Sequence, residues 1–133
     1  MKEIKKFLKN IGIYPTPQRV KILEYLRSTK EHPTADIIYE KLKKELPYLS
    51  KTTVYNTLKL FKEKGIIQEL TIDPEERRFD GNPEPHVHFK CLKCGKVFDI
   101  KDEIKIQKKE KIEGHIIKEV HLYLKGICKN CQK

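Results

Sequence analysis

The segment SKTTVYNTLKLFKEKG, residues 50–65, decides how the first half of the chain is organised. Ser50 precedes Val54, Leu58 and Phe61, which follow the i, i+4, i+7 spacing of one helix face. Serine is a favoured N-cap, and Gly65 beyond the apolar series suits a helix C-terminus. The opposite side is polar, basic and aromatic. The segment therefore predicts an amphipathic helix with an exposed polar face.

Two further helices are expected before this one. Thr16 and Pro17 supply an N-cap and a first-turn proline for a helix that ends near Ser28. Thr34 can cap the next helix, in which apolar residues recur every four positions until Pro47 closes it.

A short hairpin is expected after the third helix. Residues 67–72 and 77–79 are extended stretches on either side of the turn-forming sequence at 73–76. Three helices followed by a hairpin describe a winged helix-turn-helix.

The sequence Asp-Gly-Asn-Pro-Glu-Pro at 80–85 is rich in residues that break regular structure, so we expect a hinge there between domains at 1–79 and 86–133. The second domain is expected to hold strands at 87–90, 96–100 and 116–126 and a helix at 102–113. The fold class is thus α+β, a winged helix-turn-helix followed by a small α/β domain. About 50 residues make a marginal core, so pairing with a second copy and binding zinc would stabilise this domain.

The net charge of +10 favours a polyanionic partner, although the basic excess is spread along the chain and indicates no particular face. The sequence contains no apolar run of 18 residues, and its amino terminus lacks the features of a secretory signal. We therefore expect a soluble, cytoplasmic protein.

The four cysteines form two Cys-x-x-Cys pairs, Cys91 with Cys94 and Cys128 with Cys131, separated by 33 residues. Without an export signal this spacing indicates zinc ligation before disulfides. Four thiolates would fill every zinc position and make the site structural. The alternative is a redox dithiol.

Nitrogen and oxygen donors gather around the proposed hinge. They are Asp80, His86, His88 and Asp99, with His32 available from the first domain. Residues two apart on a strand face the same side, so His86 and His88 can converge on one ion, and this donor set suits Fe(II), Mn(II) or Zn(II). Taken singly, His32 can cap a helix, Asp80 can stabilise a turn and Asp99 can be a surface charge. We interpret the remaining histidines, His115 and His121, as structural.

The polar face of the 50–65 helix suits a recognition helix in a DNA major groove. Asn56 can pair with an adenine edge and Tyr55 can contact a thymine methyl, while Arg19 and Lys51 suit phosphates. The alternative is an ordinary solvated face. The contact candidates are Arg19, Lys51, Thr52, Thr53, Tyr55 and Asn56.

Several motifs occur in the order of one known family. They are Thr16-Pro17-Gln18-Arg19, His32-Pro33-Thr34-Ala35, Thr52-Thr53-Val54-Tyr55, Arg78-Phe79-Asp80, His86-Val87-His88 and the two cysteine pairs. Over nearly its whole length the chain resembles the ferric uptake regulator family. The resemblance implies a homodimeric, metal-dependent repressor that has a winged-helix domain, a hinge and a dimerisation domain, and that binds a palindromic operator in double-stranded DNA.

The resemblance also implies two ions per subunit. These are a structural Zn²⁺ at the four cysteines and a regulatory Fe²⁺ or Mn²⁺ held by His32, Asp80, His86, His88 and Asp99. Carboxylates at Asp80 and Asp99, together with Asn56, resemble the peroxide-sensing branch, in which iron chemistry with peroxide oxidises the histidines matching His32 and His86. The alternative is an iron, manganese or zinc uptake regulator of the same family without peroxide sensing.

Two other classes of function compete with this interpretation. Histidines and carboxylates around iron also describe non-haem oxygenases, but the sequence indicates no acid–base pair or substrate pocket. A zinc-ribbon interaction module would leave the nitrogen and oxygen donors unexplained. We therefore expect a regulator that is not an enzyme.

Overall fold

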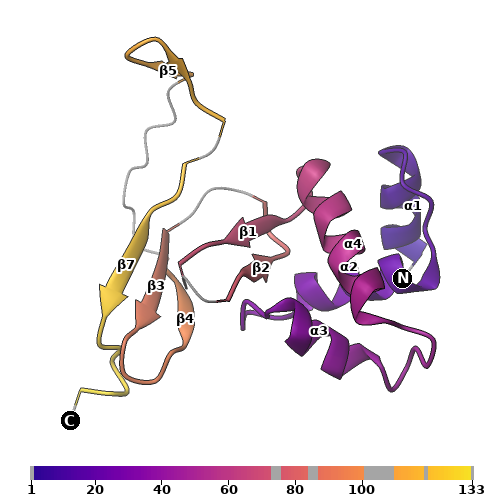
Figure 1. Cartoon of the computed structure of the whole chain (residues 1–133), viewed down its shortest axis with the longest axis horizontal. Coiled ribbons are helices and arrows are strands. Elements are labelled where there is room, and N and C mark those ends of the chain that lie inside the picture. Colours follow the sequence, from indigo (N-terminus) through magenta and orange to yellow (C-terminus); the bar gives the residue numbers. More distant parts are fainter. Residues whose placement is uncertain (1, 73–75, 84–86, 101–109, 119, 133) are drawn as a thin grey trace. The chain divides into compact units, whose positions relative to one another are not determined.

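The computed structural model describes residues 2–72, 76–83, 87–100, 110–118 and 120–132. Backbone contacts divide the chain into two compact units, Met1–Pro83 and Glu84–Lys133 (Figure 1). Among the described residues, no helix is both long and apolar enough to cross a membrane.

The first unit is a helical bundle followed by a hairpin. Its elements are α1 (Lys2–Asn10), α2 (Pro17–Ser28), α3 (Ala35–Leu42), α4 (Lys51–Glu63), β1 (Gln68–Leu70) and β2 (Arg78–Asp80). The strands of the hairpin are antiparallel, with Glu69 opposite Phe79. The predicted winged helix-turn-helix is confirmed, with α4 as its third predicted helix and β1–β2 as its wing.

The expected caps are present at all three predicted helices. The side chains of Thr16, Thr34 and Ser50 each accept a hydrogen bond from the backbone N–H three residues later. Such caps satisfy amide groups that lack partners inside the helix. The caps fix where these helices begin, as the sequence predicted.

Helix α3 ends earlier than expected, at Leu42 and not at Pro47. After Leu42 the chain tightens, because Glu45 N–H donates to the Leu42 carbonyl at 3.1 Å, the i to i+3 spacing of a turn. Proline also disfavours helical geometry at the residue that precedes it. Leu46 nevertheless packs against the core, as its spacing indicated.

Helix α1 was not predicted as a separate helix from the sequence. It buries Leu8, with Ile4, Phe7 and Ile11 partly buried beside it. Gly12, at φ 82°, ends the helix, and the N–H of Ile13 donates to the Leu8 carbonyl at 2.9 Å. This is a Schellman ending, in which glycine takes the left-handed position.

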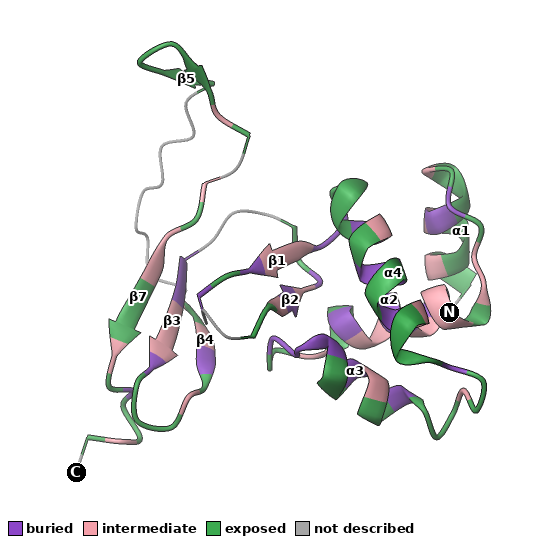
Figure 2. Cartoon of the chain, viewed as in Figure 1, coloured by how far each residue is buried: buried purple, intermediate pink, exposed green. Residues whose placement is uncertain are grey.

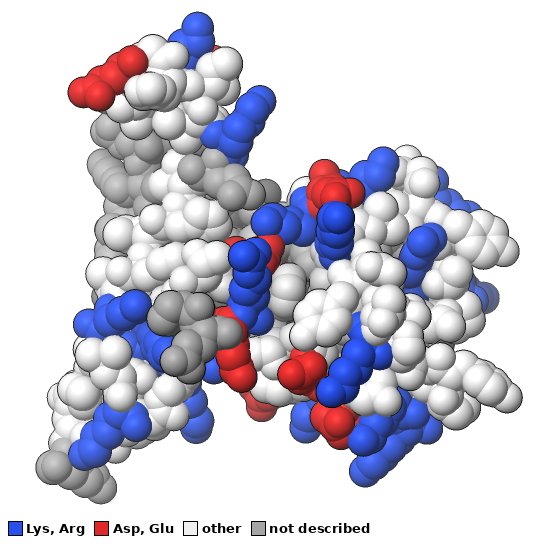
Figure 3. Space-filling view, in the orientation of Figure 1, with Lys and Arg blue, Asp and Glu red and all other residues white. Residues whose placement is uncertain are grey.

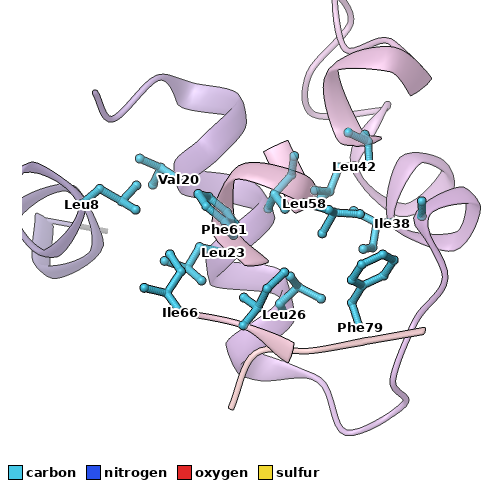
Figure 4. Close-up of a cluster of buried hydrophobic side chains, with 14 of the residues drawn as sticks. Leu8, Val20, Leu23, Leu26, Ile38, Leu42, Leu58, Phe61, Ile66 and Phe79 are labelled. Atoms are coloured by element: carbon cyan, nitrogen blue, oxygen red, sulfur yellow. The ribbon is translucent and has the colours of Figure 1, made fainter. Parts of the chain in front are cut away.

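The core of the first unit lies between the helices and also includes the wing. Figure 4 shows Phe79 of β2 among side chains of the helices, and Figure 2 shows buried residues along the inward sides of α2 and α4. Phe79 is 7% exposed, and Phe61 and Leu23 are fully buried. Phe79 therefore attaches the wing to the helical bundle by apolar packing.

The second unit is built on a three-stranded sheet in the order β4-β3-β7. These strands are β3 (Val87–Cys91), β4 (Val97–Ile100) and β7 (Tyr123–Gly126). Strand β3 pairs antiparallel with β4 and parallel with β7. The parallel pairing brings Cys91 opposite Gly126, and so brings the two cysteine pairs to one end of the sheet.

The expectation of a helix at 102–113 is wrong at its C-terminal end; residues 101–109 lie outside the described residues. Strands β5 (Lys111–Ile112) and β6 (His115–Ile116) form an antiparallel hairpin. Glu113 and Gly114 have φ values of 52° and 84°, the left-handed geometry of a tight two-residue hairpin turn. The region predicted as one strand at 116–126 is also divided, because Ile116 ends β6 and β7 begins only at Tyr123. Ile112 of β5 is 48% exposed.

Lysine and arginine side chains are distributed over the visible face of each unit, with acidic groups among them (Figure 3). This agrees with the sequence, in which the basic excess indicates no single face. A binding surface therefore has to be identified from the fold and not from charge alone.

Candidate metal centres and DNA-binding surface

The four cysteines meet at one end of the second unit. Cys91 ends β3, and Cys128 and Cys131 follow β7. The four Sγ atoms all lie within 4.8 Å of one another, and those of Cys94 and Cys128 are 3.9 Å apart. A tetrahedral zinc site with Zn–S bonds of about 2.3 Å places its sulfurs about 3.8 Å apart. The donor set and its spacing fit a structural Zn²⁺, as predicted.

Backbone amides surround one of these sulfurs. The N–H groups of Lys93, Cys94 and Cys128 each donate to Cys91 Sγ at 3.4 Å. These bonds, with that from Cys128 the largest contribution, lower the pKa of the Cys91 thiol to about 6. Cys91 is therefore prepared to act as a thiolate ligand.

The fourth cysteine shows why the cluster needs a cation. Hydrogen bonding of the Cys131 thiol to Cys128, followed by desolvation, raises the pKa of Cys131 to about 12. Several thiolates cannot share so small a space unless a positive charge offsets their repulsion. A divalent zinc ion supplies that charge and keeps coordinating thiols deprotonated.

A histidine–carboxylate pair lies within the first unit. His32 Nε2 is 3.4 Å from Asp80 Oδ2, and the two side chains are 2% and 11% exposed. His32 stands just before α3, and Asp80 ends β2. Asp80 also accepts a hydrogen bond from the N–H of Asn82 at 2.9 Å, so it stabilises a local turn as well as facing His32.

A second histidine–carboxylate pair lies within the second unit. His88 and Asp99 are directly opposite each other in the β3–β4 pairing, and His88 Nε2 is 3.4 Å from Asp99 Oδ1. His88 is fully buried, whereas Asp99 keeps a third of its side chain exposed. His86 lies outside the described residues. The structure thus forms two pairs, one in each unit; their joint role with His86 as ligands of one regulatory ion stays a prediction.

The remaining histidines, expected to be structural, are exposed in the second unit. His115 belongs to β6, and His121 Nδ1 is 3.1 Å from the hydroxyl of Tyr123.

Most of the predicted DNA contacts lie on the exposed side of α4. Lys51, Thr52 and Asn56 are exposed, and Tyr55 is 53% exposed. About half of the Tyr55 side chain is therefore available to a partner. The exposed face therefore has the composition expected of a recognition helix, although contact with DNA stays a prediction.

Two other DNA-contact candidates are engaged within the protein. Thr53 is half-buried, and its hydroxyl lies 2.9 Å from Ser50 Oγ at the cap of α4. Arg19 Nη1 donates to the Tyr14 carbonyl at 3.0 Å. This contact holds part of the Arg19 guanidinium at the start of α2.

A buried carboxylate that sequence reasoning did not single out connects α4 to the wing. Glu69, 8% exposed, pairs with Lys62 of α4 at 2.6 Å and with Arg77, just before β2, at 2.5 Å. Burial raises the pKa of Glu69, but hydrogen bonds from Lys62 and Arg77 outweigh burial and lower it below its ordinary value. No spacing in the sequence indicated this cluster, because it depends on the hairpin folding back along α4.

Comparison with known proteins places the chain among metal-responsive regulators. The model of the "Ferric uptake regulator family" matches residues 10–125. The "Peroxide operon regulator" of Bacillus subtilis is 39% identical over 137 residues, covering 100% of this chain and 94% of that protein. The "Peroxide-responsive repressor PerR" of Staphylococcus aureus is 40% identical over 129 residues, covering 94% and 86%.

Solved structures show the same fold. The peroxide stress regulator of Campylobacter jejuni matches with a TM-score of 0.68 and 28% identity, covering 98% of this chain and 97% of that one. The match extends over both units, and the identity of the curated relatives extends over nearly the whole sequence. The chain therefore belongs to the ferric uptake regulator family.

Proposed function

We propose that this chain is a metal-dependent, DNA-binding transcriptional repressor that senses peroxide through Fe(II)-dependent oxidation of a histidine ligand. The observation that carries the proposal is the division of the ligands. One buried histidine–carboxylate pair belongs to the unit with the recognition helix, and a second belongs to the other unit.

An ion that takes ligands from both units would couple metal binding to DNA binding. His32 and Asp80 would bind it from the first unit, and His86, His88 and Asp99 from the second. Loss of the ion, or oxidation of a ligand, would release the units from each other. The recognition helices of a dimer would then no longer match half-sites about one helical turn apart.

The differential affinity that such a switch needs is moderate. Moving a two-state equilibrium from 1:99 to 99:1 takes about 5.5 kcal/mol of preferential binding to one state. An ion whose full ligand set exists only when the units are joined can supply a preference of this size. The donor set of imidazoles and carboxylates fits Fe²⁺ or Mn²⁺, with one regulatory ion in each subunit.

Peroxide sensing is supported by the donor types and by the named relatives. Fe²⁺ would supply the reductant for hydrogen peroxide, and the imidazoles of His32 and His86 would be the oxidisable groups beside it. Mn²⁺ in the same place would permit repression without this reaction. The two peroxide regulators named above are about two-fifths identical to this chain over nearly its full length.

The proposed partners follow from the first unit and from the marginal size of the second. The exposed face of α4 would read a palindromic operator in double-stranded DNA, which requires a homodimer with two recognition helices. Four thiols reserved for zinc suit a reducing compartment, so we place this activity in the cytoplasm. The proposal assigns the chain no enzymatic turnover.

The test is DNA binding by the zinc-loaded protein after addition of Fe²⁺ or Mn²⁺, each with and without a low dose of hydrogen peroxide. We expect both metals to promote DNA binding. Only the iron form should then release DNA on peroxide treatment and gain oxygen on the peptides that carry His32 or His86, as read by mass spectrometry.

The second candidate function is metal-uptake regulation without peroxide sensing. It predicts that both metal forms keep binding DNA after peroxide and that their histidines stay unmodified. If DNA binding is the same with and without added metal, both candidates are wrong, and a zinc-ribbon module without metal sensing becomes the better description.

A further inference from the structure

The backbone of His32 adopts a conformation that histidine rarely takes. Its φ angle is 54°, in the left-handed region, although the residue is not glycine. His32 is also 3% exposed, so its imidazole is confined to one place next to Asp80. A strained residue of this kind persists only where its surroundings impose the conformation.

The side chain of Arg78 contacts the strained segment. Its Nη1 donates to the His32 carbonyl at 3.2 Å, across 46 positions of sequence. The Arg78 backbone also forms an isolated β-bridge with Thr34, on the other side of its pairing with Leu70 in the wing. Arg78 is thus connected to the segment before α3 through both its backbone and its side chain.

The backbone on either side of Arg78 fixes the same alignment. The N–H of Phe79 donates to the Pro33 carbonyl at 3.0 Å, so the segment at 32–34 runs along β2. Asp80, the next residue of β2, is thereby brought opposite His32. The Arg78 guanidinium closes this arrangement at the carbonyl of the strained residue itself.

The position of Arg78 leaves one of its side-chain donors without a hydrogen bond. Its Nε is buried and has no hydrogen-bond partner among the described residues. A buried donor left in this way is unfavourable for stability, and its retention calls for a reason beyond packing. Because a guanidinium is always charged and cannot bind a cation, Arg78 can act on a metal site only through the residue that it holds.

We propose that Arg78 is a positioning residue for the regulatory ion: it holds the His32 backbone in its left-handed conformation and so preforms the His32–Asp80 pair within the first unit. This inference rests on the proposed function, since it concerns the affinity of the same site. Groups that orient metal ligands without touching the metal typically change affinity by about 10–100-fold when removed.

The test compares Mn²⁺ affinity among variants of the full-length, zinc-loaded protein, measured by the loss of the free Mn²⁺ electron paramagnetic resonance signal. We expect Arg78→Met to raise the Kd for Mn²⁺ at least tenfold. Arg78→Lys keeps a charged donor able to reach the carbonyl, and its Kd should stay within about threefold of the wild type.

The matched control is Arg77→Met, which removes an exposed arginine beside Arg78 that pairs with Glu69 and not with His32. Its Kd should be unchanged.

A second measurement separates positioning from a general structural role. At saturating Mn²⁺, Arg78→Met should bind operator DNA as tightly as the wild type, because excess metal compensates for a weakened site. A Kd within twofold of the wild type, or DNA binding that saturating Mn²⁺ does not restore, would overturn the proposal. If Arg78→Met does not fold, Arg78→Gln takes its place under the same criteria, because its amide is too short to reach the carbonyl.

The wild type and His32→Ala form the reference pair. Equal Mn²⁺ affinity in these two proteins would remove the proposed regulatory site, and the role of Arg78 with it. A His32-dependent affinity that Arg78→Met leaves unchanged would instead overturn the positioning role alone.

Discussion

Gly81 lies so close to Leu26 that a Cβ added at Gly81 would stand 2.7 Å from both the carbonyl carbon and the carbonyl oxygen of Leu26. Gly81 directly follows Asp80, and the next residue, Asn82, accepts a hydrogen bond from Gln68 Nε2 at 2.8 Å. The beginning of the segment expected to act as a hinge is therefore packed against α2 and β1. Asp80 consequently has a fixed position within the first unit.

Replacing Gly81 with alanine should destabilise the first unit. The new methyl group meets backbone atoms that cannot rotate away, and overpacking of this kind costs about 1–3 kcal/mol. Urea unfolding of Gly81→Ala should show that loss in the free energy of unfolding. Gly126→Ala is the control, because its nearest neighbour is the Phe89 ring at 3.4 Å, which can shift. Equal stability of Gly81→Ala and the wild type would contradict the close packing.

Zinc retention should depend on pH in one direction. The pKa of Cys131 is raised to about 12 in the metal-free cluster, so protons compete with zinc for that sulfur at neutral pH. Competition weakens as pH rises, and affinity for zinc should therefore increase from pH 6 to pH 8. A chelator titration with a zinc indicator measures this trend, and an affinity that falls with pH would refute it.

Removal of zinc should unfold the end of the second unit. Cys131→Ser should lose the ion and the order of the segment after β7, while the helical unit keeps its circular dichroism signal. The buried Cys91, which receives three backbone hydrogen bonds, should be the most damaging of the four positions to replace. Zinc content and amide hydrogen exchange of β3 and β7 provide the measurements.

Glu69 should contribute to stability above its ordinary pKa and lose that contribution in acid. Its pKa in the folded protein lies below the ordinary value of 4.5, so the folded state favours the ionised form. Stability should thus fall as pH decreases from about 4.5 through the lower folded-state pKa. Glu69→Gln should show less of this acid dependence in thermal unfolding. The same slope in both proteins would mean that the pairs with Lys62 and Arg77 contribute nothing.

Two positions on α4 should separate base reading from phosphate contact. Asn56→Ala should cost about 1–3 kcal/mol of operator affinity and relax the preference at one base pair. Lys51→Ala should weaken binding to all sequences. It should also reduce the slope of log affinity against log salt concentration by about one. Both residues are exposed, so the fold should be unaffected. Binding isotherms at several salt concentrations would detect each effect, and an unchanged affinity in both variants would exclude this face as the DNA contact.

Local signals account for what could be predicted in the first unit. Thr16, Thr34 and Ser50 begin helices because their side chains satisfy backbone amides three residues on, an interaction contained in a few residues of sequence. The apolar spacing around Val54 and Leu58 likewise follows from helix periodicity. The early end of α3 and the Glu113–Gly114 turn were missed, because tightened turns and two-residue hairpins leave weaker patterns than caps and periodic faces do.

The sequence by itself determined the donor types: four thiols suited to zinc, a set of imidazoles and carboxylates suited to Fe²⁺, Mn²⁺ or Zn²⁺, and a helix with a polar face. Residue chemistry and short spacings are sufficient for those conclusions. Only the tertiary structure decided that His32 adopts a left-handed conformation with its carbonyl bonded to Arg78, and that Gly81 has no room for a side chain. Those relationships depend on where β2 lies against α2 and the segment before α3, and such long-range packing leaves no periodic pattern in the sequence.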